Sequence, residues 1–288
     1  MSLNTQSFKD IVKKYKTIFF DAYGVLKNHK GLIPEIGSTF SYLKEHNIDY
    51  FILTNDASRG PIELAEAYQQ AGLTEITEQK LISSGMLARE YLRLKVNEGT
   101  IAYLGTTNSA HYIEALGLKI KPIQSIELDK ADDISAVVFL DDEGFDWNHD
   151  INKVVNLLRR RNIPAIVCNT DKSYPVSKEE VAIAIGGLSI MVEQIVRKKF
   201  IRFGKPDAQM FIYAYEHALN NGQLIDKNDI LMVGDTLTTD ILGGNKFGLD
   251  TALVLTGNTL PSQAEFYIQT TGIIPNYVCE SAVIKNGA

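Results

Sequence analysis

Six polar residues stand directly after short apolar runs or at the start of helical patterns: Asp21, Thr54, Asn55, Lys205, Asp235 and Asp240. Their side chains are of types that can bind a hard cation or an anionic group. Taken singly, none is informative, because an aspartate after an apolar run is often a helix cap or a turn residue. The segment Gly234–Asp240 says more, since it opens a helix with two carboxylates. Capping explains a lone motif of this kind equally well, so its meaning depends on the elements around it.

Four apolar runs have the length and composition of buried strands: Thr17–Phe20, Tyr50–Leu53, Ile230–Val233 and Ala252–Leu255. Each ends abruptly in polar or turn residues, which is typical of strands buried on both faces of a parallel sheet. Helical patterns separate them, at Pro34–His46, Pro61–Gln70, Asp207–Asn220 and Thr239–Phe247. This alternation predicts an α/β fold with a Rossmann-like parallel sheet. Because ligands bind at the carboxyl ends of such strands, the polar residues should share one edge.

The middle of the chain repeats this alternation on its own. Three strand-like runs and two helical stretches make up the repeat: Thr100–Leu104, Ala136–Leu140, Ile163–Cys168, Asn108–Leu116 and Asn148–Arg160. We therefore predict two domains, an α/β core formed by residues 1–88 and 183–288, and a smaller α/β domain inserted at residues 89–182.

Composition narrows the class of protein. The chain has 288 residues, of which 45% are hydrophobic and 22% charged, and its net charge is −6. The two basic runs, Arg159–Arg161 and Arg197–Lys199, end helical patterns, where cations stabilise the helix, so nothing indicates nucleic-acid binding. Cys168 and Cys279 cannot form a disulfide framework and lack metal-site spacing. No apolar run approaches the roughly 18 residues that span a bilayer, and we predict a soluble, cytoplasmic protein with no membrane partner.

Taken in chain order, the motifs resemble those of the haloacid dehalogenase (HAD) superfamily: Asp21–Leu26, Thr54-Asn55, Lys205-Pro206, and Gly234-Asp235 with Asp240. Gly31–Pro34, after a short flap-like stretch, matches as well. The inserted domain resembles the α/β cap of the class IIA branch, which includes 4-nitrophenylphosphatase-like, phosphoglycolate and nucleotide phosphatases. Cys168–Asp171 resembles a cap segment of that branch that usually has the pattern Thr-Asn-x-Asp.

The resemblance implies a Mg²⁺-dependent hydrolase that forms an aspartyl-phosphate on Asp21. It implies that Asp21, Asp235 and the backbone carbonyl of Tyr23 bind Mg²⁺, and that Asp240 completes this acidic set. Lys205 would neutralise charge on the nucleophile and on the phosphate. The remaining implied donors to the phosphoryl oxygens are the Thr54 side chain and the Asn55 amide.

The cap would select the substrate, a small phosphorylated metabolite. The resemblance assigns this role to Asn169, Thr170 and Asp171, for which turn formation is the structural alternative. Relatives of this branch often associate through their caps, which implies a homodimer.

Tyr23 departs from the family, because phosphatases of this superfamily carry at this position a second aspartate that protonates the leaving alcohol and then activates water. A phenol with a pKa of about 10 is a poor base at neutral pH. Losing a positioned acid/base removes about 10²- to 10⁴-fold in rate. We therefore expect slow phosphatase activity or, alternatively, a catalytically weak binding or sensor protein.

Two further alternatives remain open. The segment Asp21–Gly24 also resembles 2-haloacid dehalogenases, but these are metal-free and lack the acidic pair that this chain retains in Asp235 and Asp240. His29 or Asp56 could replace the missing acid, since both are titratable and lie near the motifs in sequence. A solvated loop histidine and a capping or turn-closing aspartate are the commoner explanations.

Overall fold

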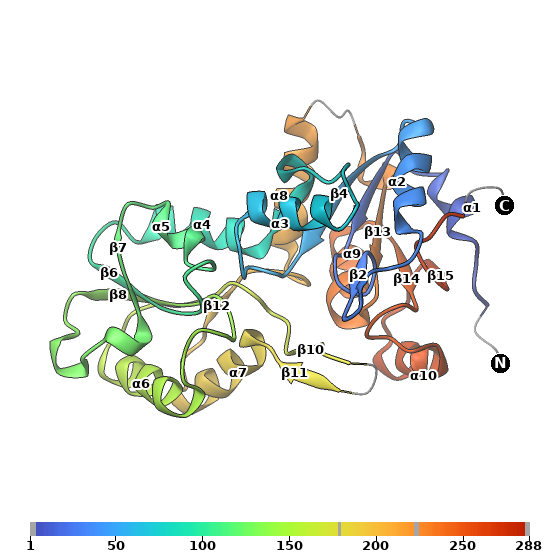
Figure 1. Cartoon of the computed structure of the whole chain (residues 1–288). Helices are drawn as coiled ribbons and strands as arrows, with labels where there is room; N and C mark the ends of the chain where they lie inside the picture. The colour runs from blue at the N-terminus through green and yellow to red at the C-terminus, as the bar shows by residue number, and fades with distance from the viewer. Residues whose placement is uncertain (1–3, 178–179, 222–224, 286–288) are drawn as a thin grey trace. The chain divides into compact units, whose positions relative to one another are not determined.

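The computed structural model describes residues 4–177, 180–221 and 225–285, and the chain folds into two compact units (Figure 1). The core unit comprises the chain up to Thr54, Leu64–Ile82, and the chain from Lys205 onward. The inserted unit comprises Asn55–Glu63 and Ser83–Gly204. The predicted α/β class is confirmed in both units, each of which is built on a sheet with parallel strands.

A six-stranded sheet in the order β15-β14-β13-β1-β4-β5 forms the centre of the core unit. Its strands are β1 (Thr17–Phe20), β4 (Asp49–Thr54), β5 (Leu81–Ser83), β13 (Ile230–Gly234), β14 (Asp250–Val254) and β15 (Tyr277–Cys279). Strand β1 pairs in parallel with β13 and β4, and β14 pairs in parallel with β13 and β15. The central strands are almost entirely buried, as their apolar runs predict for a parallel sheet.

Alternate side chains of β1 pack on opposite faces of this sheet. Phe20 packs on Phe40, which packs on Tyr50, with ring centroids 5.8 and 4.8 Å apart. Phe19 points to the other face, as neighbouring strand residues must, and packs on Phe51 at 6.1 Å. The helices of this unit, including α3, which begins in the inserted unit, are α1 (Phe8–Val12), α2 (Ile36–Glu45), α3 (Pro61–Gln70), α8 (Ala208–Asn220), α9 (Leu242–Phe247) and α10 (Pro261–Thr271).

The chain leaves β1 and β13 in opposite directions along the sheet. From β1 it passes through α2 to β4 and on to β5, whereas from β13 it passes through α9 to β14 and β15. The strand order therefore reverses between β1 and β13, which makes this edge the topological switch point where ligands bind. Phe20 pairs with Val233, and the Asp21 N–H donates to the Val233 carbonyl at 2.8 Å. The ends of the two strands are thus fixed side by side.

The segment after β13 differs from the helix predicted at Thr239–Phe247. A wide π-helical turn, Leu237–Ile241, comes first, and the regular helix α9 begins only at Leu242. The Asp240 carboxylate accepts a hydrogen bond from the Thr236 N–H at 3.1 Å, which keeps this turn folded back on the strand end. Periodicity alone does not reveal such a turn, and π-helical turns are frequent at functional sites.

The inserted unit has its own five-stranded sheet, in the order β12-β9-β8-β6-β7, with parallel pairing throughout. Its strands are β6 (Thr100–Leu104), β7 (Lys119–Pro122), β8 (Ile134–Phe139), β9 (Ala165–Val167) and β12 (Ile201–Arg202). Its helices and its separate hairpin are α4 (Ser84–Lys95), α5 (His111–Glu114), α6 (Trp147–Arg160), α7 (Ile185–Val196), β10 (Ser173–Pro175) and β11 (Val181–Ile183). Among the described residues, no helix is long and apolar enough to cross a membrane.

The bounds of this unit differ from the expected insertion at 89–182. Helix α7 belongs to it because Leu188 and Val192 share a buried cluster with Val137 of β8. Strand β12 also belongs to it, since it pairs with β9. The apolar periodicity of α7 fits either domain, and only tertiary packing decides between them.

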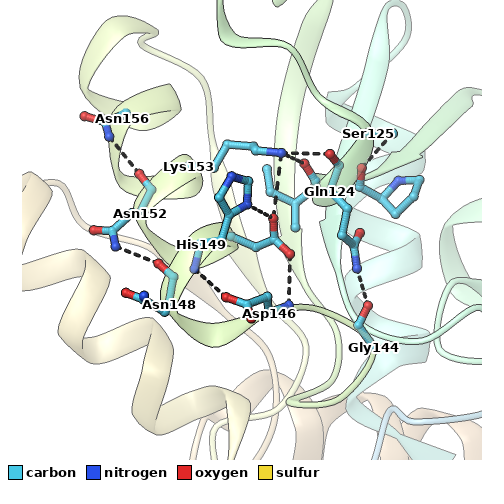
Figure 2. A network of polar contacts seen from close by, with 12 residues as sticks. Gln124, Ser125, Gly144, Asp146, Asn148, His149, Asn152, Lys153 and Asn156 are labelled. Atoms are coloured by element: carbon cyan, nitrogen blue, oxygen red, sulfur yellow. Dashed lines mark hydrogen bonds and ion pairs between the residues drawn. The ribbon is translucent and has the colours of Figure 1, made fainter.

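A polar network ties the start of α6 to the turn after β7 (Figure 2). Asp146 caps the helix by accepting from the His149 N–H at 2.6 Å, and the Asp150 carboxylate accepts from the Asp146 N–H at 2.9 Å. Lys153 Nζ lies 3.7 Å from Asp150 Oδ1 and donates to the Gln124 carbonyl at 2.7 Å. Asp150 is 1% exposed, so its charge depends on these partners.

We predict that Asp150→Ala lowers the free energy of unfolding of the inserted unit by about 2 kcal/mol, because charge-assisted hydrogen bonds to a buried carboxylate are lost. Asp150→Asn keeps one oxygen acceptor and should lose less. Asn156→Ala is the control, since this exposed side chain donates to the Asn152 carbonyl within α6 and should contribute little. Urea unfolding followed by circular dichroism measures all three variants, and equal losses for Asp150→Ala and Asn156→Ala would contradict the assignment.

Candidate active site

Three carboxylates meet at the switch point of the core sheet. Asp21 follows β1, Asp235 follows β13 and Asp240 lies in the π-helical turn, and one oxygen of each lies within 4.8 Å of the others. Asp235 and Asp240 are buried, and the Asp21 side chain is 14% exposed. Like charges buried this close are costly unless a cation accompanies them. The all-oxygen donor set fits a hard divalent cation such as Mg²⁺.

Lys205 supplies one positive charge to this cluster. Its Nζ lies 2.5 Å from Asp21 Oδ1 and 2.7 Å from Asp240 Oδ1, and the side chain is 2% exposed. Burial alone would lower the pKa of Lys205, but the charges of Asp21 and Asp240 outweigh it and raise the pKa above the ordinary lysine value. The ammonium group therefore stays protonated. One lysine against three carboxylates leaves an excess of negative charge in a buried place.

The crowding also changes the carboxylates. Burial raises the pKa of Asp21 well above its ordinary value, and the charges of Asp240 and Asp235 add to this while Lys205 opposes it. Burial, with the charge of Asp240, raises the pKa of Asp235 to about 7. The Asp235 carboxyl is therefore partly protonated near neutral pH, and a cation that binds it must displace a proton.

A loop after β14 holds Asp235 in place. Asp235 accepts from the Thr236 hydroxyl at 3.0 Å and from the Asn258 N–H at 2.5 Å, while the Thr256 hydroxyl donates to the Gly24 carbonyl at 2.5 Å. A Cβ atom at Gly257 would lie 1.9 Å from Asp235 Oδ2, so only glycine fits there. Thr256–Asn258 was not among the predicted site residues. Its signal was the polar ending of the run Ala252–Leu255 at the same sheet edge.

Tyr23 lies half-buried two residues after Asp21. Burial raises the pKa of its phenol, and the charge of Asp235 raises it further. The hydroxyl is therefore protonated at neutral pH and can donate a hydrogen bond, but it cannot take a proton from water.

The predicted phosphate-binding pair is divided between the units. Thr54 is the buried last residue of β4, and Asn55 is the first residue of the inserted unit. The Asn55 side-chain amide donates to Thr170 Oγ1 at 3.0 Å and to Asp171 Oδ1 at 2.9 Å. Asn169 accepts from the Asp171 N–H at 2.8 Å and closes a turn, as the structural alternative expects. The sequence did not predict the contact between Asn55 and this cap segment.

The two candidate replacement acids have structural explanations in the fold. His29 is exposed in the turn between β2 (Lys27–Asn28) and β3 (Gly31–Leu32). Asp56 accepts from the N–H and the hydroxyl of Ser58, at 2.9 and 2.6 Å, which closes a turn.

Comparison with known proteins gives the family. Residues 18–119 match the model of the haloacid dehalogenase-like hydrolases, and residues 202–282 match a second HAD-hydrolase-like model. A solved HAD-superfamily structure from Cytophaga hutchinsonii, described as a possible sugar phosphatase, is 57% identical over 99% of this chain and 100% of its own, with a TM-score of 0.95. This chain belongs to the HAD superfamily.

More distant curated relatives of this HAD protein include chicken glycerol-3-phosphate phosphatase, which is 24% identical over 97% of this chain and 93% of its own length. Bovine chronophin is 27% identical over 97% of this chain and 95% of its own length. A glycerol phosphate phosphatase from Mycobacterium tuberculosis, solved with magnesium, has a TM-score of 0.76 at 21% identity, covering 97% of this chain and 78% of its own. The predicted superfamily is thus confirmed, and the HAD protein is a hydrolase with phosphatases as its relatives.

We predict that Lys205→Met in metal-free protein costs about 3 kcal/mol of the free energy of unfolding at pH 8, because two buried carboxylates lose their cation. The loss should be smaller at pH 5. Without Lys205 the folded-state pKa of Asp21 rises further above the ordinary value of 3.8. The variant is therefore most stable at low pH, where Asp21 is protonated, and it loses stability as the pH rises from 3.8 through the raised pKa.

The control for this measurement is Lys16→Met. Lys16 pairs with Asp229 at 3.0 Å on the surface, with its side chain 64% exposed, and its removal should matter little. Denaturant unfolding at both pH values measures the two variants. A loss for Lys205→Met that does not grow with pH would contradict the ion-pair assignment.

Proposed function

We propose that this HAD hydrolase is a Mg²⁺-dependent phosphomonoesterase that acts on a small phosphorylated metabolite through an aspartyl-phosphate at Asp21. The observation that carries the proposal is the buried cluster of three carboxylates with Lys205 at the switch point. Excess negative charge in such a place is explained by a divalent cation, and a cation beside a nucleophile suits an anionic substrate. The relatives named as sugar and glycerol phosphate phosphatases support the same substrate class.

Asp21, Asp235 and Asp240 would hold the cation, together with the Tyr23 carbonyl. Bound Mg²⁺ would supply positive charge that offsets the repulsion between the Asp21 carboxylate and the phosphoryl oxygens. Thr236 and Asn258 hold the Asp235 oxygens and so orient this ligand.

The protein's own groups then account for two steps. An oxygen of Asp21 attacks phosphorus, the bond from phosphorus to the ester oxygen breaks, and the leaving oxygen takes a proton from water. Water next attacks the aspartyl-phosphate, which releases inorganic phosphate and restores the carboxylate. Lys205 would stabilise charge on Asp21 and on the phosphoryl group. The Thr54 hydroxyl and the backbone N–H of Asn55 would donate hydrogen bonds to the phosphoryl oxygens.

Tyr23 makes the proton transfers slow. Its raised pKa lets the phenol donate a hydrogen bond to the leaving oxygen, but water activation lacks a base at this position. The alternative is a binding or sensor protein that uses the same pocket without efficient turnover. Dehalogenation is less well supported, because the acidic cluster is complete. Cytoplasmic location, the class IIA cap as the substrate selector, and association of two copies through it stay predictions.

An assay with Mg²⁺ and phosphate esters of differing leaving-group basicity tests the reaction. We expect slow hydrolysis by the wild type, no activity in Asp21→Asn, and a gain of about 100-fold or more in kcat for Tyr23→Asp, which restores a positioned acid/base. Tyr23→Phe is the matched control and should not gain. Full activity in Asp21→Asn would exclude the nucleophile role, and inactivity of both wild type and Tyr23→Asp would favour the binding protein.

We expect Gly257→Ala to weaken Mg²⁺ binding at least tenfold, because the added Cβ displaces Asp235. Isothermal titration with Mg²⁺ alone measures this without turnover. Gly37→Ala is the control, since its Cβ would make only an ordinary 3.6 Å contact with Leu73 in the same unit. Unchanged affinity in Gly257→Ala would remove Asp235 from the set of metal ligands.

A further inference from the structure

The chain crosses between the two units at four places, and two of these crossings adjoin residues of the proposed site. The units divide at Thr54/Asn55, Glu63/Leu64, Ile82/Ser83 and Gly204/Lys205. Thr54 and Lys205 lie on the core side of their crossings, and Asn55 and Gly204 lie next to them in the inserted unit. Whatever holds Asn55 and Gly204 therefore also restrains the backbone of Thr54 and Lys205.

Side chains of the inserted unit tie these crossing points together. The five residues Asn55, Ser84, Thr170, Asp171 and Gly204 form what we call the Asn55 cluster. Asn55 donates from one side-chain nitrogen to both Thr170 and Asp171. The Ser84 hydroxyl donates to the Asn55 carbonyl at 3.0 Å and also to the Cys168 carbonyl. These bonds join the segment after β4, the start of α4 and the segment after β9.

Gly204 completes the cluster by close packing. A Cβ atom at this position would lie 2.7 Å from Asn55 Oδ1 and 3.1 Å from Thr170 Oγ1, and its φ of +129° also favours glycine. The segment before Lys205 thus packs directly against the amide and hydroxyl that meet each other. Asn55 is 3% exposed and Ser84 is fully buried, so the bond between them is shielded from water. Thr170 and Asp171, which accept from the Asn55 side chain, are half-buried.

The neighbours of the cluster are themselves fixed. The Asp171 backbone lies against the start of α7, where a Cβ at Gly186 would come within 2.4 Å of the Asp171 carbonyl. Farther along the segment after Asn55, the buried Tyr112 hydroxyl donates to the Arg59 carbonyl at 2.9 Å. The cluster is therefore anchored on helices of the inserted unit. Binding groups supported by rigid elements in this way are held within a fraction of an ångström of their position.

We propose that Thr170 and Asp171 are positioning residues for the phosphate site: through Asn55 and Gly204 they hold the backbones of Thr54 and Lys205 where these residues bind the phosphoryl group. The proposal rests on the proposed phosphatase function. It differs from substrate selection by the same cap segment, because Thr170 Oγ1 and Asp171 Oδ1 both accept hydrogen bonds from the Asn55 side chain. A small misplacement of binding groups is enough to weaken phosphate binding strongly.

Inorganic phosphate separates the two roles, because it has no leaving group for a cap to select. Its affinity in saturating Mg²⁺ is measured by isothermal titration for Thr170→Val and Asp171→Ala. The matched controls are Thr170→Ser, which keeps the hydroxyl, and Asp171→Asn, which keeps an oxygen acceptor. We expect about tenfold weaker phosphate binding in Thr170→Val and Asp171→Ala, with near wild-type values in the controls. Mg²⁺ affinity without phosphate should not change, since its ligands belong to the core unit.

The contrary outcomes differ from one another. Wild-type phosphate affinity in Thr170→Val and Asp171→Ala, with KM values that change according to the leaving group, would show substrate selection and overturn the positioning role. A joint loss of phosphate and Mg²⁺ affinity with a lowered melting temperature would show general loss of structure, and overturns it as well. If the wild type itself binds neither Mg²⁺ nor phosphate, the proposed function fails first, and the positioning role with it.

Discussion

The buried ion-pair cluster of Lys205 with Asp21 and Asp240 is the constraint on which the rest of the core unit depends. A lysine and three carboxylates removed from water are stable only when their geometry is held closely, because the loss of hydration must be offset by direct contacts. The parallel sheet provides that geometry. Its central strands are held by packing on both faces, and the charged residues stand just beyond them, at the ends of β1 and β13.

Close approach of backbone to side chain is the second requirement, and glycine satisfies it. Gly234 lies against Asp240, and Gly24 and Gly257 lie against Asp235. A Cβ atom at any of these three glycines would overlap the aspartate side chain. The loops after β1, β13 and β14 can therefore close around the carboxylates. This closure raises the pKa values of Asp21 and Asp235 and prepares the cluster for a cation rather than for isolated charges.

Much of this was predictable from the sequence, because the apolar runs, their polar ends and the order of the motifs are local features. The π-helical turn at Leu237–Ile241 and the contact of Asn55 with Thr170 and Asp171 were not, since they depend on which segments meet in space. The same reason explains the late end of the inserted unit. Helix α7 has an apolar stripe that fits either domain, and only its packing beside β8 assigns it.

Tyr23 leaves the proposed site with a nucleophile and metal ligands but without the acid/base group that an aspartate at this position would provide. The proposed metal ligands and the proposed nucleophile need burial and crowded negative charge, and the carboxylate cluster has both. The same burial, with the charge of Asp235, raises the pKa of the phenol and so removes it from acid/base exchange at neutral pH. An ester whose leaving oxygen is weakly basic needs little help from an acid, whereas an alkyl phosphate needs much. In the mechanism that we propose, the geometry therefore favours phosphate binding and attack by Asp21 over proton transfer, and the basicity of the leaving group sets the rate of hydrolysis.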